Sequence, residues 1–272
     1  MKKVLYHIEH AEQEWILDRI GSEFKQHSRH NLTFRSCYDG IFIDDFDIIW
    51  LGASYDWQRL GCSPQTKDKL ELVRKLASNP VICTIHHVTP WKWSESKHYE
   101  FMLRDKFVDM YHVYTEQVAG FVRWLSKKPV KIIPHWVDSK TWYPLNKDKC
   151  REELGIKKEN FIIGSFQRDT EGSDLTSPKL EKGPDIFVEI CKYFYNDKWN
   201  AQILLGGQRR QYVINSLNRL NIPYLYFENA DLETVNKMYS ACDLYVVGSR
   251  IEGGPQAVFE AAATRTNIIS TD

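Results

Sequence analysis

Short apolar runs alternate with amphipathic stretches along almost the whole chain. The runs predict buried strands, and the stretches between them carry apolar residues at helical spacing. The predicted strands are 4–8, 47–52, 80–85, 111–114, 130–133, 161–166, 202–205, 224–227, 243–247 and 267–270. The predicted helices are 14–27, 67–77, 115–125, 184–195, 211–220, 232–242 and 255–264. This alternation indicates an α/β fold with parallel sheets that helices cover on both faces.

The alternation is interrupted between residues 134 and 149. This stretch carries Pro134, Pro144 and several polar residues, which favour a linker. A length of 272 residues also suits two α/β domains of ordinary size. The sequence therefore predicts two Rossmann-like, doubly wound domains, 1–142 and 143–272, that face a cleft where a ligand binds.

Composition excludes several classes of protein. Lys plus Arg (36) balances Asp plus Glu (36), so the general basic field of a nucleic-acid-binding protein is absent. The six cysteines form no C-x-x-C pair and fit no zinc pattern, which is typical of reduced thiols in the cytosol. No stretch reaches the ~20 apolar residues of a membrane span. We therefore expect a cytoplasmic protein, with peripheral contact at the inner face of a membrane as an alternative, and no nucleic-acid partner.

The densest candidate site is the sequence from 246 to 263, where a predicted strand ends and a helix begins. Gly253 and Gly254 allow close approach of the backbone to a ligand, and Pro255 suits the first turn of a helix. The helix start offers N–H groups and a positive dipole end to an anion. Glu252 and Glu260 flank this start and can accept hydrogen bonds from hydroxyl groups. The alternative is a tight turn with a surface glutamate at each end, which the full pattern makes the weaker interpretation.

Two cations belong to the same edge of the predicted sheet. Arg168 follows the strand 161–166, and Lys182 opens the helix at 184. A guanidinium offers a planar fork to phosphate oxygens and an ammonium offers a point charge, so the pair could stabilise a departing diphosphate. A long polar segment, 169–180, separates them. It could form a lid, and it leaves Lys179 as the alternative cation.

The second half resembles the catalytic domain of retaining glycosyltransferase family 4, which has the GT-B fold. The similar elements are the strand from Gly164 to Arg168, the Glu-Lys-Gly that opens a helix at 181–183, and the Glu-x7-Glu pattern from Glu252 to Glu260. The Ile-Pro-His-Trp-Val-Asp run at 133–138, followed by Trp142, is similar to the family's domain crossover. The resemblance is specific over roughly 130–272 and weak before it.

The resemblance implies transfer of a sugar from a nucleotide-diphosphate donor, with retention of configuration, to a saccharide or lipid-linked acceptor. It implies that Arg168 and Lys182 hold the diphosphate, that Glu260 binds the ribose and that Glu252 contacts the donor sugar. Backbone amides of Gly253, Gly254 and the helix start would contact the sugar and phosphates, and no metal ion or other cofactor is expected. The family usually has a glycine-rich loop after the first strand, which residues 7–12 lack, and further elements after position 272. We therefore expect C-terminal elements of the family to be missing here.

The first half carries weaker signals. The family often places a histidine near the donor sugar, and His86 and His87 both follow the strand 80–85, with His86 the preferred one. Trp91 and Trp93 could stack on a sugar, although packing is at least as good an interpretation. The Asp-Asp-Phe-Asp run at 44–47 precedes a strand and is interpreted as a solvated turn instead of a metal site. The basic, aromatic stretch 123–131 could rest on an anionic membrane, but a solvated helix end explains it more simply.

Three other functions remain open at this point. A nucleotide-sugar epimerase of the same fold would use a similar diphosphate clamp with acid and base groups such as Glu9 and Glu12. A catalytically silent nucleotide-sugar-binding module would bind the donor without turnover. A nicotinamide dehydrogenase is the weakest alternative, because no Gly-x-Gly-x-x-Gly turn follows the first strand.

Overall fold

The chain forms two compact units, Met1–Pro134 and His135–Asp272. The computed structural model describes residues 1–8, 16–36, 43–54, 78–173, 175–196 and 199–271. The division falls earlier than the predicted position after residue 142. The reason is packing, because Trp142 is 2% exposed and its ring meets that of Tyr239 in the second unit at 5.7 Å. The segment that the sequence marks as a linker thus begins the second unit.

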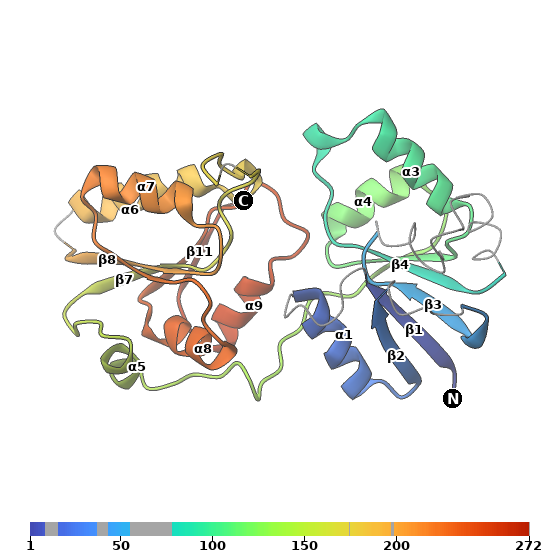
Figure 1. Cartoon of the computed structure of the whole chain (residues 1–272), viewed down its shortest axis with the longest axis horizontal. Helices are drawn as coiled ribbons and strands as arrows, with labels where there is room; N and C mark the ends of the chain where they lie inside the picture. Colours follow the sequence, from blue (N-terminus) through green and yellow to red (C-terminus); the bar gives the residue numbers. More distant parts are fainter. Residues whose placement is uncertain (9–15, 37–42, 55–77, 174, 197–198, 272) are drawn as a thin grey trace. The chain divides into compact units, whose positions relative to one another are not determined.

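The first unit is a parallel six-stranded sheet with helices on both faces. The strand order is β2-β1-β3-β4-β5-β6, and every adjacent pair is parallel. The strands are β1 (Lys3–Ile8), β2 (Asn31–Ser36), β3 (Ile48–Leu51), β4 (Val81–Ile85), β5 (Met110–Val113) and β6 (Val130–Ile132). The helices are α1 (Ile16–His27), η1 (Ile43–Asp45), η3 (Pro90–Lys92), α3 (Glu95–Asp105) and α4 (Glu116–Leu125). Figure 1 shows α3 and α4 on one face of this sheet and α1 on the other.

One strand and one α-helix of the described first unit were not predicted, β2 and α3. The β2 sequence, NLTFRS, has no continuous apolar run and only the short alternation given by Leu32 and Phe34, and pairing with β1 from Lys3 to Ile8 makes it a strand. The α3 sequence is mostly polar, and its buried side includes Phe101 and Leu103. Ser94 caps α3, because its side chain accepts a hydrogen bond from the backbone N–H of Lys97. The predicted helix 67–77 lies outside the described residues.

The second unit is a parallel five-stranded sheet of order β11-β10-β7-β8-β9. The strands are β7 (Phe161–Ser165), β8 (Ala201–Gly206), β9 (Tyr224–Phe227), β10 (Leu244–Val247) and β11 (Ile268–Ser270). The helices are α5 (Lys147–Glu153), η4 (Leu180–Lys182), α6 (Pro184–Asn196), α7 (Gln211–Leu220), α8 (Leu232–Ala241) and α9 (Gln256–Ala263). In Figure 1, α6 and α7 cover one face of this sheet, and α8 and α9 cover the other.

Each unit has its own apolar core. In the first unit the fully buried Leu5, Ile49, Val81 and Val113 come from four neighbouring strands of the sheet. The second unit has apolar clusters on both faces of its sheet, because its strands are covered by helices on both sides. This is the pattern that the apolar runs of the sequence predict. Among the described residues, no helix has the length and apolar character needed to span a membrane.

Candidate functional site

Two oppositely charged side chains meet at the carboxyl edge of the second unit's sheet. Lys182, the last residue of η4, donates from Nζ to Oε1 of Glu252 at 2.5 Å. Ser249, which lies just beyond β10, donates from Oγ to the same oxygen at 2.8 Å. Gln167, just beyond β7, donates from Nε2 to the carbonyl oxygen of Lys182 at 2.9 Å. The structure thus brings the predicted pair Lys182 and Glu252 together with Ser249 and Gln167, which the sequence did not single out.

Close packing of two glycines sets the position of Lys182. Gly183 has a φ of 58°, and a Cβ built on it would lie 1.7 Å from the carbonyl oxygen of Gly248. Only glycine combines this left-handed backbone with so close an approach. The backbone N–H of Arg250 donates to the carbonyl oxygen of Glu181 at 2.8 Å, and the Arg250 guanidinium pairs with both carboxylate oxygens of Asp185. The loop after β10 is therefore held directly against the start of α6.

The glycine loop leads into α9 as the sequence predicts. Gly253 is buried, and Gly254 has a φ of 105°, a conformation that disfavours any residue with a side chain. Pro255 is the N-cap residue and Gln256 is the first residue of the helix. The first turn of an α-helix carries N–H groups without intrahelical partners and the positive end of the helix dipole. This loop can therefore receive an anion beside Glu252.

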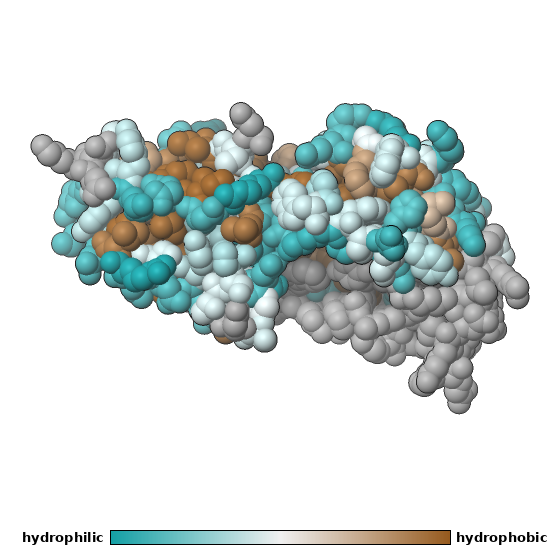
Figure 2. Space-filling view, turned by 90° about the horizontal axis from the view of Figure 1, so that it is seen from above, coloured by the Kyte–Doolittle hydropathy of each residue, from teal (hydrophilic) through white to brown (hydrophobic). Residues whose placement is uncertain are grey.

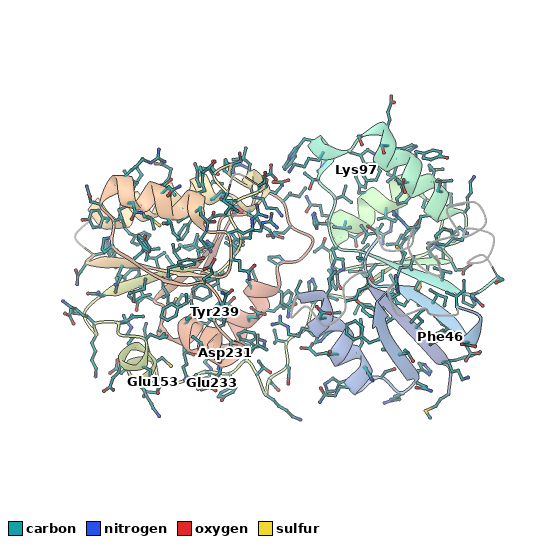
Figure 3. The ribbon with its side chains drawn as sticks, in the orientation of Figure 1. Phe46, Lys97, Glu153, Asp231, Glu233 and Tyr239 are labelled. Carbon is teal, nitrogen blue, oxygen red and sulfur yellow. The ribbon has the colours of Figure 1, made fainter. Side chains whose placement is uncertain are left out.

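Glu260 lies deeper than the other predicted site residues. It is 8% exposed, and its Oε2 accepts a hydrogen bond from the Tyr239 hydroxyl at 3.0 Å. Tyr239 lies between α8 and the sheet (Figure 3), and its ring centroid is 5.0 Å from that of Tyr245 on β10. Burial, together with the neighbouring Tyr245 and Glu260, raises the pKa of Tyr239 well above its usual value. Tyr239 therefore stays protonated and orients the Glu260 carboxylate.

Arg168 lies at the base of a hairpin whose described residues are 169–173 and 175–179. Its Nε donates to the carbonyl oxygen of Thr170 at 2.8 Å, and its side chain is exposed. Partial burial and the nearby Arg209 lower the pKa of Arg168, but an arginine remains charged at neutral pH. The hairpin is closed by a bridge between Thr170 and Pro178 and by a hydrogen bond from the backbone N–H of Lys179 to the carbonyl oxygen of Asp169. The segment predicted as a lid is thus anchored at its base.

A buried ion pair at the base of this hairpin was not predicted from the sequence. Arg210 is 1% exposed, and its Nε donates to Oδ2 of Asp169 at 2.9 Å. Its Nη1 donates to the carbonyl oxygens of Ser165 and Gly206 at 2.7 and 3.1 Å, which joins the ends of β7 and β8. A buried charge needs such partners. The only signal in the sequence is a pair of arginines after the Gly-Gly that ends a strand.

In the first unit, His86 directly follows β4, as predicted. Its Nε2 lies 2.7 Å from the carbonyl oxygen of Gly52, and its ring lies 5.3 Å from that of Tyr114. A carbonyl oxygen only accepts, so Nε2 carries the hydrogen and Nδ1 is an acceptor. Burial lowers the pKa of His86 to about 4 despite the hydrogen bond to Gly52. The imidazole is therefore neutral at pH 7.

Other candidates of the first half have structural partners. Asp47 accepts a hydrogen bond from the backbone N–H of Lys3 at 2.7 Å, which fits the predicted turn. The described residues contain no cluster of His, Cys, Asp and Glu that could hold a metal ion. Trp93 packs against Phe101 and Phe121, whereas Trp91 is 59% exposed. Glu9 and Glu12 lie outside the described residues.

Comparison with protein families gives a match for the second unit. Residues 147–272 match the family model described as "Glycosyl transferases group 1". The match covers nearly all of the second unit, including Arg168, Lys182, Glu252 and Glu260. A search of curated proteins finds no match for this chain.

Solved structures similar to the whole chain have the fold that the sequence predicts. The chain is 14% identical to Anabaena Alr3699/HepE in complex with UDP and glucose, with a TM-score of 0.68, and the match covers 99% of this chain and 80% of that one. Sucrose-phosphate synthase from Thermosynechococcus elongatus is 13% identical, with a TM-score of 0.67 and coverages of 99% and 81%. WaaG, a glycosyltransferase involved in lipopolysaccharide biosynthesis, is 12% identical, with a TM-score of 0.58 and coverages of 98% and 80%. The predicted GT-B-like α/β fold is thus confirmed, and the chain is shorter than these neighbours.

Proposed function

We propose that this chain is a glycosyltransferase that uses a nucleotide-diphosphate sugar and binds it at the carboxyl edge of the second unit's sheet. The observation that carries the proposal is the convergence of Lys182, Glu252 and the start of α9 at that edge. A cation, a carboxylate and a helix N-terminus are the groups that recognise a phosphate attached to a polyhydroxylated sugar. The family match over residues 147–272 supports the same function.

In this proposal the protein stabilises the leaving group by charge. Lys182 and Arg168 bind the diphosphate, and amides of Gly253, Gly254 and the first turn of α9 contribute further hydrogen bonds. These groups are held in place before the donor arrives, so they can stabilise developing negative charge without rearrangement. The diphosphate then takes the place of Glu252 on the Lys182 ammonium, and Glu252 turns to hydroxyls of the donor sugar. The transfer needs no metal ion and no protein nucleophile.

Glu260 is proposed as the ribose ligand. A carboxylate has two oxygens that accept several hydrogen bonds, so Tyr239 can hold Oε2 while the carboxylate also receives a ribose hydroxyl. His86 is proposed to act as a neutral acceptor for a sugar hydroxyl through Nδ1, because its low pKa makes it a poor proton donor at pH 7. The acceptor hydroxyl attacks the anomeric carbon on the face from which the nucleoside diphosphate departs, and its proton passes to the departing phosphate oxygen, so configuration is retained. The acceptor is a saccharide or a lipid-linked saccharide.

The first test is calorimetric titration with UDP, GDP and ADP and then with their common sugar conjugates, in the presence of a chelator. We expect one nucleoside diphosphate to bind wild type. Lys182→Met should weaken this binding roughly tenfold to a hundredfold, the effect of losing a charged hydrogen bond. Lys179→Met tests the alternative cation. Lys149→Met is the control, because the Lys149 side chain is 75% exposed and belongs to α5. Absence of binding by any nucleotide to the folded protein would contradict the proposal.

Glu252→Gln gives a second readout at the same site. Glutamine removes the charge that neutralises Lys182, so we expect tighter binding of the free nucleoside diphosphate and loss of the added affinity that the sugar provides. Incubation with donor alone separates a transferase from an epimerase, because only an epimerase forms product without an acceptor. Donor binding without turnover on any acceptor would point to the silent binding module.

A further inference from the structure

The first unit carries an exposed ridge of aromatic side chains along η3 and α4. The ridge consists of Trp91, Trp93, Phe121 and Trp124, of which Trp93 and Phe121 are half-buried and Trp91 and Trp124 are exposed. The ring of Phe121 lies 4.9 Å from that of Trp93 and 5.8 Å from that of Trp124, so these three rings form a continuous chain, and Trp91 lies two residues before Trp93. Trp124 is 74% exposed and Trp91 is 59% exposed. Large exposed tryptophans that line up in this way indicate a contact surface.

The ridge lies on the outer side of α4. The inner side of this helix buries Val118, Ala119 and Val122 in the core. Gly120, on the exposed side, has no atom within 4 Å of the place where a Cβ would stand. Figure 2 views the face formed by α3 and α4 from above, with apolar and weakly polar atoms in its middle and hydrophilic atoms around them. An extended flat partner can therefore reach the ridge.

Positive charge surrounds the ridge. Lys92 stands between Trp91 and Trp93, Arg123 precedes Trp124, and Lys127 and Lys128 follow Ser126, the C-cap of α4. Glu116 pairs with Arg123, but within the described part of the chain Lys127 and Lys128 form no ion pair. The whole chain has a net charge of zero, so this excess of cations is local. The partner of the ridge must combine an apolar layer with negative charge.

We propose that the aromatic ridge docks on a lipid surface that contains anionic headgroups. Tryptophan rings favour the interface between headgroups and acyl chains, and lysine and arginine beside them are attracted to anionic lipids. The second unit provides an internal contrast. Its exposed Tyr193 and Trp199 pack around Phe161 and Phe194, beside the hydrogen-bonded amides of Asn160 and Asn200, and the nearby Lys158 and Lys192 are paired with Asp148 and Glu189. The ridge of the first unit instead has Lys127 and Lys128 without an ion pair among the described residues, and this proposal is independent of the sugar-transfer function.

Co-sedimentation of the full chain with phospholipid vesicles tests this proposal. One set of vesicles is pure phosphatidylcholine, and the other contains about one third phosphatidylglycerol, enough for a negative surface potential. We expect binding to the anionic vesicles alone, and weaker binding as salt shortens the range of the attraction. Trp124→Ala and Lys127→Glu should each lower the partition coefficient about tenfold.

Matched variants of the second unit test whether vesicle binding is specific to the ridge or is a general effect of exposed tryptophan and lysine side chains. Trp199→Ala removes another exposed tryptophan, and Lys157→Glu reverses another exposed lysine, so both should bind vesicles like wild type. Circular dichroism establishes that every variant is folded. Equal binding to both kinds of vesicle, or equal losses in the ridge and control variants, overturns the proposal. Sedimentation without vesicles that Trp124→Ala abolishes also overturns it, because it assigns the ridge to a second copy of the chain.

Discussion

At the scale of single residues, the charged groups of this chain are held by specific neighbours. Lys182 and Glu252 neutralise each other at the sheet edge, Asp169 accompanies the buried Arg210, and Tyr239 orients Glu260. Each arrangement fixes a side chain before any ligand arrives, which suits electrostatic recognition of a diphosphate. A buried histidine of the first unit is also held by specific neighbours. His112 donates from Nε2 to the carbonyl oxygen of Ile133 and accepts from the Thr84 hydroxyl through Nδ1.

The low pKa of His86 predicts a pH dependence of stability. The pKa is about 4 in the folded protein and roughly 6.5 in an unfolded chain, so the unfolded state binds more protons between these values. The contribution of His86 to stability is complete above pH 6.5 and is lost as the pH falls toward 4, by about 1 kcal/mol per pH unit. Denaturant unfolding between pH 7 and pH 4.5 measures it. Relative to wild type, His86→Asn should flatten the fall, and His98→Asn, a change at an exposed position, should not. Parallel curves for wild type and His86→Asn would contradict this prediction.

At the scale of elements, loops after the strands are set by backbone packing as much as by side chains. Gly183 lies against Gly248, so the start of α6 and the end of β10 approach as closely as two backbones can. Arg210 joins the ends of β7 and β8 to the base of the hairpin 169–179. The position of Lys182 follows from the first arrangement, and that of Arg168 depends on the second. Both predicted cations are thus placed by residues other than the predicted ligand-binding ones.

Two glycines with similar φ angles allow the energetic cost of close packing to be distinguished from the cost of a strained backbone. Gly183 and Gly155 have φ values of 58° and 69°, but only Gly183 meets a neighbouring atom. Gly155→Ala should lower the free energy of unfolding by about 1–2 kcal/mol, which is the strain of a left-handed residue. Gly183→Ala should lower it by about 2–5 kcal/mol, because overpacking adds to the same strain. Urea denaturation of both variants measures the difference, and equal losses would show that the contact with Gly248 relaxes freely.

At the scale of the whole molecule, each unit has a core of its own. Trp142 belongs to the core of the second unit and Phe101 to that of the first, at 2% and 1% exposed. Separate cores favour separate unfolding of the two units. In our proposals the diphosphate and the ribose bind the second unit, whereas His86 and the lipid-binding ridge belong to the first. Stability can therefore be altered in one unit at a time.

Matched core truncations test this independence. Trp142→Ala and Phe101→Ala should each destabilise their own unit by about 3–5 kcal/mol, as large-to-small changes in a core do. Hydrogen exchange followed by mass spectrometry assigns the loss of protection to peptides of each unit. We expect Trp142→Ala to affect residues 135–271 alone and Phe101→Ala to affect the first unit alone. Loss of protection in both units from either change would show that they unfold together.

The elements predicted from the sequence agree best with the structure where the local pattern alone determines the element. The ranges of α7 and β9 are the predicted ones, because clear periodicity meets clear turn residues at both ends. Helix α9 and its glycine loop also follow the prediction closely. The prediction differs from the structure where contacts with residues distant in the sequence determine the element or its unit. Pairing with β1 makes residues 31–36 a strand, and packing on Tyr239 assigns Trp142 to the second unit.

The sequence by itself determined the alternation of strands and helices, the presence of two α/β units and the edge at which the candidate residues gather. These features follow from hydrophobic periodicity and from the rule that parallel strands carry ligands at their carboxyl ends. Only the tertiary structure decided which partners and surroundings these residues have, including the Lys182–Glu252 pair, the buried Arg210 and the burial that keeps His86 neutral. Such contacts join residues far apart in the chain, and their energies depend on burial and distance, which no local pattern specifies.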